Sequence, residues 1–275
     1  MGEACVPYNP QRVVTLSTAD LANALALGVK PIATANDFNP ATGEFPSYLD
    51  SQAQGIPTLG TSGQPNLETI LELKPDFIFG WFGSGTEATS PLLNQIAPTV
   101  VYNWWDLSWK EVFNSTAQLL GKEDVAQAAW EHYQARIEDL KASLGNRYQD
   151  KKISFISFYF GGIETSVNNS FVGSILKDAG LQRPPAQNID VEHGHIELSL
   201  EEIDKVDGDV LFVASFNDAD QEAVEKLKRN PLWQTLKAVQ QNQVYFVDGV
   251  TWVWGSDMIG AEAVIDDLQK YLEPR

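Results

Sequence analysis

The chain has 275 residues, which at about 150 residues per domain corresponds to nearly two domains. Its 37 Asp and Glu residues outnumber its 19 Lys and Arg residues, which gives a formal net charge of −18. A nucleic-acid-binding protein needs a basic face to neutralise phosphates, and an anionic membrane surface repels an acidic chain, so both partner classes are excluded. Hydrophobic residues make up 43% of the sequence, which is enough for folded cores and excludes a disordered acidic tail.

The chain contains one cysteine, Cys5, so neither an intramolecular disulfide nor a cysteine-based metal site is expected. It contains no run of about 18 apolar residues, so we expect no membrane-spanning helix. The first residues have neither the basic nor the apolar segment of a secretory signal. We therefore expect either a cytosolic protein or one whose signal was removed. Gly2 stands where a lipobox has an apolar residue, which favours a semi-buried Cys5 over a lipidated one.

Short apolar runs rich in β-branched and aromatic residues alternate with helical patterns. In chain order, the sequence predicts strands at 12–16, 32–35, 76–80, 99–102, 152–158, 209–214 and 244–247. It predicts helices at 19–27, 66–74, 91–96, 122–144, 170–178, 199–205, 231–239 and 256–271. This alternation is typical of βαβ units, so we expect an α/β fold with mainly parallel sheets.

The longest predicted helix runs from about residue 122 to 144, and Gly145-Asn146 supplies its stop signal. Apolar residues recur along it at spacings of three and four: Val125, Ala129, Tyr133, Ile137, Leu140 and Leu144. At 1.5 Å per residue the helix is roughly 35 Å long, about the width of a small domain. We therefore expect it to join two domains.

The two halves of the chain repeat each other. The pattern L-E-x-I-x-x-apolar-x-x-D-apolar-apolar-F begins at Leu67 and again at Leu200, and P-L-x-x-x-apolar begins at Pro91 and again at Pro231. Ordered matches at a near-constant offset favour two similar Rossmann-like lobes, whereas the alternative is two unrelated halves. We expect an N-terminal ligand-binding lobe at 1–121, a backbone helix at 122–146 and a C-terminal ligand-binding lobe at 147–275.

Five of the eight tryptophans follow predicted strands. Ligands of open α/β sheets bind beyond the carboxyl ends of the strands, so these rings predict a cleft lined by aromatic side chains. The alternative is that some rings, such as Phe216 and one of Trp104 and Trp105, only pack under their loops. The same loops are almost free of Lys and Arg, which predicts a bulky ligand with little net charge. Arg183 is the nearest candidate cation.

Enzyme motifs are missing from these loops. The glycines of 80–85 have the order G-x-x-G-x-G, which is not the dinucleotide fingerprint, and no P-loop or nucleophile elbow occurs. His132 is expected on the surface of the long helix. His193 and His195 suggest a metal site, but two histidines in a loop are a weak signal, and a solvated loop is favoured. We therefore expect no enzyme, no resident metal and no intrinsic cofactor.

Glu68 and Glu201 occupy equivalent places in the repeat. Asn66 and Ser199 are expected to cap the two helices, which places each glutamate in a first helical turn. Acidic residues favour this place through the helix dipole, and Ser199 with Glu202 forms a capping box that leaves Glu201 unexplained. From the residues alone, dipole stabilisation and a pair of anchors for a two-fold partner stay equally open.

Four segments of the sequence carry a recognisable pattern. Residues 5–14 have the form V-P-x-N-P-x-R-V-V, and residues 60–79 contain P-N-L-E-x-I-L-x-L-K-P-D-x-I. Residues 230–245 have the form N-P-L-W…L-x-A-V…V-Y, and residues 170–180 form a fourth segment. In these segments the sequence resembles the ferric-siderophore substrate-binding proteins of ABC importers, with 170–180 similar to the opening of their second lobe. The resemblance covers nearly the whole chain and is weakest at 189–196.

The resemblance implies two Rossmann-like lobes bridged by one long helix, with a ligand cleft between them. It implies that one glutamate per lobe docks arginines of the two permease subunits, and Glu68 and Glu201 match those positions. It also implies a monomeric, periplasmic (extracytoplasmic) protein whose signal peptide is absent from this sequence, and it makes the full-length protein a candidate for a lipid anchor.

The ligand implied by the resemblance is a ferric siderophore. Relatives that bind catecholate or citrate complexes use clusters of Arg or Lys, which these loops lack, so we expect a hydroxamate-type ligand. Cobalamin, also large and nearly neutral, is the alternative within this fold, and a two-lobed α/β metalloenzyme is the alternative outside it. The expected ligand contacts are Trp81, Tyr102, Trp104, Tyr159, Trp252 and Trp254.

Overall fold

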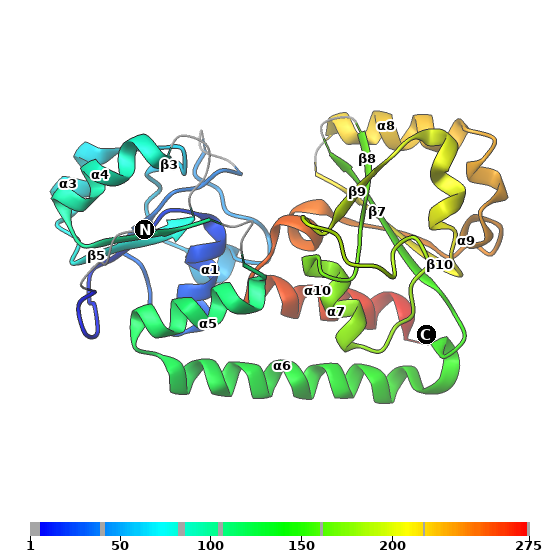
Figure 1. Ribbon diagram of the computed structural model, residues 1–275, viewed down its shortest axis with the longest axis horizontal. Helices are drawn as coiled ribbons and strands as arrows, with labels where there is room; N and C mark the ends of the chain where they lie inside the picture. Colours follow the sequence, from blue (N-terminus) through cyan, green and yellow to red (C-terminus); the bar gives the residue numbers. More distant parts are fainter. Residues whose placement is uncertain are drawn as a thin grey trace. The chain divides into compact units, whose positions relative to one another are not determined.

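The computed structural model describes residues 6–38, 42–81, 86–103, 107–159, 162–216 and 218–273. The chain divides into two compact α/β units (Figure 1). Unit 1 comprises Met1–His132 with Asp257–Ile259, and unit 2 comprises Tyr133–Ser256 with Gly260–Arg275. The divide falls inside the long helix α6, Glu123–Leu144, so this helix bridges the units as the sequence predicts.

Unit 1 is built on a parallel sheet with the strand order β2-β1-β5-β6. Its strands are β1 (Val13–Thr15), β2 (Ala33–Thr34), β5 (Phe77–Trp81) and β6 (Thr99–Tyr102), and β3 (Gly60–Thr61) pairs separately with β4 (Gln64–Pro65). Its helices are α1 (Thr18–Ala26), α2 (Asp50–Ala53), α3 (Leu67–Leu73), α4 (Thr86–Ile96) and α5 (Trp109–Leu120).

The sheet of unit 1 is covered by helices on both faces (Figure 1). Val14 and Ile78 of the strands pack against Ile70 of α3 and Leu93 of α4 in one buried cluster. On the other face α1 packs against α5. Sheets buried on both faces need continuous apolar strands, which explains why V-V-T and F-I-F lack strict alternation.

Unit 2 is built on a five-stranded sheet with the order β11-β10-β7-β8-β9. Strands β7 (Ile153–Tyr159), β10 (Val210–Ser215) and β11 (Val244–Asp248) are parallel to one another. Strand β8 (Gly162–Ser166) runs antiparallel to both of its neighbours, β7 and β9 (His195–Leu198). Its helical segments after α6 are η2 (Gly145–Tyr148), α7 (Phe171–Asp178), η3 (Leu200–Val206), α8 (Asp218–Arg229), η4 (Trp233–Thr235), α9 (Lys237–Gln240), η5 (Val250–Trp254) and α10 (Met258–Leu272).

The core of unit 2 also lies on both faces of its sheet. Ile156 and Val213 pack with Ile203 of η3, Leu227 of α8 and Trp233 on one face. On the other face, Trp252 of η5 stacks on Phe155 and Phe212. The sheet therefore holds η5, which follows β11, firmly in the core.

The buried stripe of α6 differs from the predicted one at its first two positions. Tyr133, Ile137, Leu140 and Leu144 are buried as expected, but Val125 is 40% exposed. Ala126 is buried instead, and Trp130 packs on Trp109 and Phe113 of α5. The stripe therefore keeps a spacing of four and three residues through Trp130, one position later than predicted.

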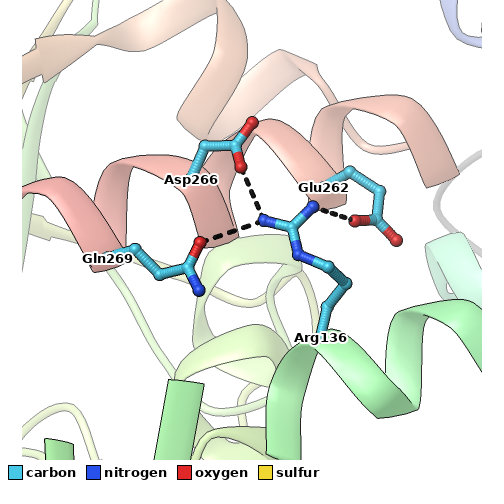
Figure 2. Close-up of polar contacts among 4 residues, drawn as sticks. All are labelled: Arg136, Glu262, Asp266 and Gln269. Atoms are coloured by element: carbon cyan, nitrogen blue, oxygen red, sulfur yellow. Dashed lines mark hydrogen bonds and ion pairs between the residues drawn. The ribbon is translucent and has the colours of Figure 1, made fainter. Parts of the chain in front are cut away.

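Arg136 attaches α6 to α10 within unit 2 (Figure 2). Its Nη1 lies 2.8 Å from Glu262 Oε2, and its Nη2 lies 2.5 Å from Asp266 Oδ1 and 3.2 Å from Gln269 Oε1. The three partners are spaced at helical intervals on one face of α10, so a single guanidinium fork spans two turns of that helix.

Several elements were not expected from the sequence. These include the longer helices α5 and α8, the strands β3, β4, β8 and β9, and the short segments α2, η2 and η5. The helix expected at 231–239 is split into η4 and α9. His132 is exposed on α6, as predicted. Within the described residues, every helix is too short or too polar to cross a lipid bilayer.

Candidate ligand-binding site

Two aromatic residues of unit 1 are neighbours where its sheet ends. Trp81 is the last residue of β5, Tyr102 is the last residue of β6, and the parallel ladder pairs them directly. Both are partly buried. Ligands of open α/β sheets bind at this carboxyl edge. The fold thus brings together two of the six side chains that the sequence nominates as ligand contacts.

A buried carboxylate holds this pair in place. Asp20 of α1 is 0% exposed. Its Oδ2 accepts hydrogen bonds from Ser17 Oγ at 2.5 Å and from the backbone N–H of Trp81 at 3.0 Å, and the Tyr102 hydroxyl donates to its Oδ1. One side chain therefore joins the start of α1 to the ends of β5 and β6.

Local sequence explains why Asp20 lies here. Ser17 has extended backbone angles and caps α1, because its side chain accepts a hydrogen bond from the Asp20 N–H at 3.1 Å. Asp20 is the third residue of the helix, where a carboxylate is favoured by the helix dipole. Because α1 follows β1 directly, this first turn is placed at the carboxyl edge of the sheet.

Gly80 allows β5 to approach Asp20. Its φ of +154° is one that side chains rarely adopt, and a Cβ at this position would lie 2.5 Å from Asp20 Oδ2 and 2.8 Å from Leu16 Cβ. No larger residue fits without moving the carboxylate. The glycine just before Trp81 is therefore part of the same arrangement.

The electrostatics of this cluster follow from its burial. Burial raises the pKa of Asp20 from 3.8 to about 6, although the hydrogen bonds from Ser17, Tyr102 and Trp81 lower it; the negative charge of Asp37 adds to the increase. Burial and the neighbouring Asp20 also raise the pKa of Tyr102 well above 10.0. Near neutral pH, Asp20 is therefore charged and the Tyr102 hydroxyl keeps the proton that it donates.

Unit 2 presents a second aromatic pair beyond its strands. Asp248, the last residue of β11, accepts hydrogen bonds from the Thr251 N–H at 2.9 Å and the Thr251 hydroxyl at 2.6 Å, which fixes the start of η5. Trp254 ends η5 with 37% of its surface exposed, and its ring centroid lies 4.6 Å from that of Phe216. Part of the Trp254 surface is therefore exposed, and its role as a ligand contact stays a prediction.

Trp252, two residues earlier, is placed differently. It is 0% exposed, its ring stacks on Phe155 and Phe212, and its Nε1 donates to Asp267 Oδ2 at 2.9 Å. A ring with no exposed surface cannot touch a ligand in this conformation. The predicted contact at Trp252 has no support here, because the helical turn of η5 directs this indole into the core.

For two further predicted contacts the side chain lies outside the described residues. Tyr159 is the last residue of β7, at the carboxyl edge of the sheet of unit 2, and pairs with Gly162 of β8. Its side chain lies outside the described part of the structure, as does the whole of Trp104. Both remain predictions.

Arg183, the candidate cation, has a structural role. It is 3% exposed, its Nε and Nη2 donate to Gln187 Oε1 at 3.1 and 2.6 Å, and Nη2 also donates to the Ser166 carbonyl at 2.8 Å. The Gln187 amide in turn donates to the Phe155 carbonyl and to Thr165 Oγ1. Arg183 therefore holds Gln187 in place, and Gln187 links β7 to β8 beyond the residues that their ladder pairs.

The histidine loop has no metal-site geometry. His193 is exposed, whereas His195 begins β9 opposite Ser166, and burial followed by the charge of His193 lowers the pKa of His195. Glu197 pairs with Glu164 across the same ladder. Within the described residues, no three His, Cys, Asp or Glu side chains are grouped so that they could hold a metal ion.

Glu68 and Glu201 have the local setting that the repeat predicts. Glu68 is exposed as the second residue of α3, which is capped by Asn66. Glu201 is exposed as the second residue of η3, and Ser199 with Glu202 forms the expected capping box. The caps are confirmed, while the docking role of the two glutamates stays a prediction.

Asp20 and Gly80 are the site residues that sequence reasoning missed. A usable signal was present in S-T-A-D, a capping pattern directly after a predicted strand. The link from Asp20 to Trp81 and Tyr102 joins residues 61 and 82 positions apart and follows only from the strand order.

Comparisons with known proteins agree with this architecture. A family model described as periplasmic binding protein matches residues 13–251. The achromobactin-binding periplasmic protein of Dickeya dadantii is 31% identical, over 96% of this chain and 87% of its own length. The probable siderophore-binding lipoprotein YfiY of Bacillus subtilis is 30% identical, over 97% of this chain and 83% of its own length.

Solved structures extend the agreement to three dimensions. The crystal structure of SirA from Staphylococcus aureus, complexed with staphyloferrin B, superimposes with a TM-score of 0.85 at 28% identity, covering 99% of this chain and 96% of SirA. The matched family model spans most of the chain, from β1 to η5. This chain therefore belongs to the periplasmic binding protein family.

Proposed function

We propose that this protein is an extracytoplasmic substrate-binding protein, without enzymatic activity, that captures a ferric siderophore and delivers it to the permease of an ABC importer. The observation that carries the proposal is the aromatic carboxyl edge of unit 1. Its Trp81 and Tyr102 are held by Asp20 in a chain whose full-length relatives are named for siderophore binding. The names of periplasmic and lipoprotein relatives support a location outside the cytoplasmic membrane.

The ligand class is proposed from charge. Named relatives bind different iron complexes, including achromobactin, ferric citrate and ferric hydroxamates, so their names do not select one. Segments 81–109, 159–174 and 216–224 contain neither Lys nor Arg, and the Nε and Nη2 of Arg183 are engaged by Gln187 and Ser166. A polyanionic chelate would meet few cationic partners there, which favours a nearly neutral hydroxamate complex.

Ligand titration tests the capture step. We expect ferric ferrioxamine B to quench tryptophan fluorescence saturably, and ferric citrate and cobalamin to have no effect at the same concentrations. Trp81→Phe should reduce the quenching and weaken binding several-fold. Trp130→Phe is the matched control, because this indole packs on Trp109 and Phe113 between α5 and α6. Binding of cobalamin instead would select the alternative ligand, and binding of none of the three would refute the proposed ligand class.

Uptake assays test the delivery step. We propose that Glu68 and Glu201 dock two arginine-bearing permease subunits, each protruding from an exposed first helical turn. The double variant Glu68→Ala, Glu201→Ala should lose siderophore uptake while keeping its ligand affinity. The matched control is Glu72→Ala with Asp204→Ala, which removes exposed carboxylates further along the same segments. Equal loss of uptake in both double variants would show that only net charge matters.

A further inference from the structure

We infer that Asp20 is a positioning residue of the proposed ligand-binding edge of unit 1, because its carboxylate holds the Trp81 backbone and the Tyr102 hydroxyl where β5 and β6 end. The identity of the ligand rests on the proposed function. Asp20, Trp81 and Tyr102 all belong to unit 1.

Asp20 holds the ends of two neighbouring strands of unit 1. Trp81 and Tyr102 are terminal ladder residues, so no further strand pairing continues beyond them. Asp20 supplies the missing constraint, because it accepts from the Trp81 backbone with Oδ2 and from the Tyr102 hydroxyl with Oδ1. Ser17 binds the same Oδ2 and keeps the carboxylate on the first turn of α1. One carboxylate thus holds two aromatic residues that lie on different strands.

The buried charge of Asp20 lowers the stability of unit 1. Asp20 is fully buried, and within the described residues no Lys or Arg forms an ion pair with it. Two titratable groups change the pKa of Asp20: the negative charge of Asp37 raises it, and the hydrogen bond from Tyr102 lowers it. Asp37 itself accepts hydrogen bonds from the N–H and hydroxyl of Ser62. A buried charge without a counter-ion lowers stability, so its benefit is expected at the site that it organises.

The protonation state of Asp20 should therefore matter for binding. The charged carboxylate accepts all three hydrogen bonds, whereas the protonated form must donate from one oxygen and competes with the Tyr102 or Ser17 hydroxyl. Burial raises the pKa of Asp20 to about 6, so this change falls in an accessible range. Ligand affinity should fall as the pH falls through this value, because only the charged form of Asp20 holds the ends of both strands.

Ligand binding between pH 5 and pH 8 tests this inference with ferric ferrioxamine B as the probe. The unmodified protein should lose about tenfold in affinity from pH 7.5 to pH 5, the size expected for one hydrogen bond to a charged group. Asp20→Asn should bind about tenfold more weakly at pH 7.5 and show no dependence on pH. Tyr133→Phe is the matched control, because it removes a tyrosine–aspartate hydrogen bond of 2.7 Å between α6 and α7 and should follow the unmodified protein.

A ligand-free measurement separates this inference from the proposed function. With 5-fluorotryptophan incorporated, the ¹⁹F resonance of Trp81, assigned with Trp81→Phe, should shift near pH 6 in the unmodified protein but not in Asp20→Asn. If Asp20→Asn does not fold, Tyr102→Phe should move the midpoint to higher pH, because the Tyr102 hydrogen bond lowers the pKa of Asp20.

The outcomes are distinguishable. A Trp81 resonance that ignores pH, or an Asp20→Asn protein with unchanged affinity and pH profile, overturns the positioning role. A titrating Trp81 in a protein that binds no ferric chelate supports the positioning role and refutes the proposed ligand.

Discussion

Replacing Arg136 by methionine should detach α6 from α10 within unit 2. Methionine is similar to the aliphatic stem of the arginine side chain but lacks the guanidinium, so it removes all three contacts shown in Figure 2. The consequence can be worked out contact by contact, because the partners differ in exposure. The substitution therefore tests whether a partly exposed guanidinium with three partners on one helix contributes to stability.

The contact with Glu262 should dominate. The Arg136 and Glu262 side chains are 23% and 20% exposed, so their pair is only partly screened and should contribute about 1–2 kcal/mol. Asp266 is 70% exposed, and its pair should add at most about 0.5 kcal/mol despite the 2.5 Å separation. With the Gln269 hydrogen bond, the total is about 2 kcal/mol, which should lower the unfolding midpoint of unit 2 by about 4–8 °C.

Calorimetry and urea unfolding measure this loss, and a double-mutant cycle with Glu262→Gln isolates the main pair. Lys141→Met is the matched control on the same helix, because Lys141 and Glu138 form an exposed pair at 2.8 Å that should contribute less than about 0.5 kcal/mol. The reasoning is refuted if Arg136→Met lies within about 0.5 kcal/mol of the unmodified protein, or if both variants lose equal stability.

Three further substitutions have defined outcomes. Gly80→Ala should destabilise unit 1 by about 2 kcal/mol or more in urea unfolding, because its Cβ would lie 2.5 Å from Asp20 Oδ2. Trp252→Ala should cost about 3–5 kcal/mol in the same assay, because it empties a fully buried position, and a small loss would refute its core role. Protonated Asp20 is favoured in the folded state, so its contribution to the free energy of unfolding should be complete below pH 3.8 and lost as the pH rises through about 6. Measured against Asp20→Asn, the free energy of unfolding should therefore fall by about 3 kcal/mol over that range.

The fold was largely predictable because apolar runs and caps are local signals. The βα order, the N-caps Asn66 and Ser199 and the long helix all follow from such patterns. Helix α5 was missed although Ser108 and Glu111 form a capping box that the sequence displays. Strands β8 and β9 are short and are defined by pairing with each other and with β7, which no local pattern shows.

The sequence predicted the candidate site only where the position of a residue at the end of a strand was enough to place its side chain. Trp81 and Tyr102 follow from the rule that ligands bind at carboxyl strand ends. Trp252 and Trp254 satisfy the same rule, yet η5 turns the first into the core and leaves the second 37% exposed. Whether a loop coils or extends decides the direction of each side chain, and that depends on packing against Phe155 and Phe212.

Asp20 links stability and function with opposite signs. Its raised pKa means that protonation stabilises unit 1, so stability increases as the pH falls below about 6. Over the same range the proposed binding role predicts weaker affinity, because the protonated side chain no longer accepts from both Trp81 and Tyr102. If Asp20 had no role in binding, its protonation would change stability and leave ligand affinity unchanged. Opposite pH dependences of unfolding and of ligand binding, both absent in Asp20→Asn, are therefore the signature of a charge that costs stability in order to position a binding surface.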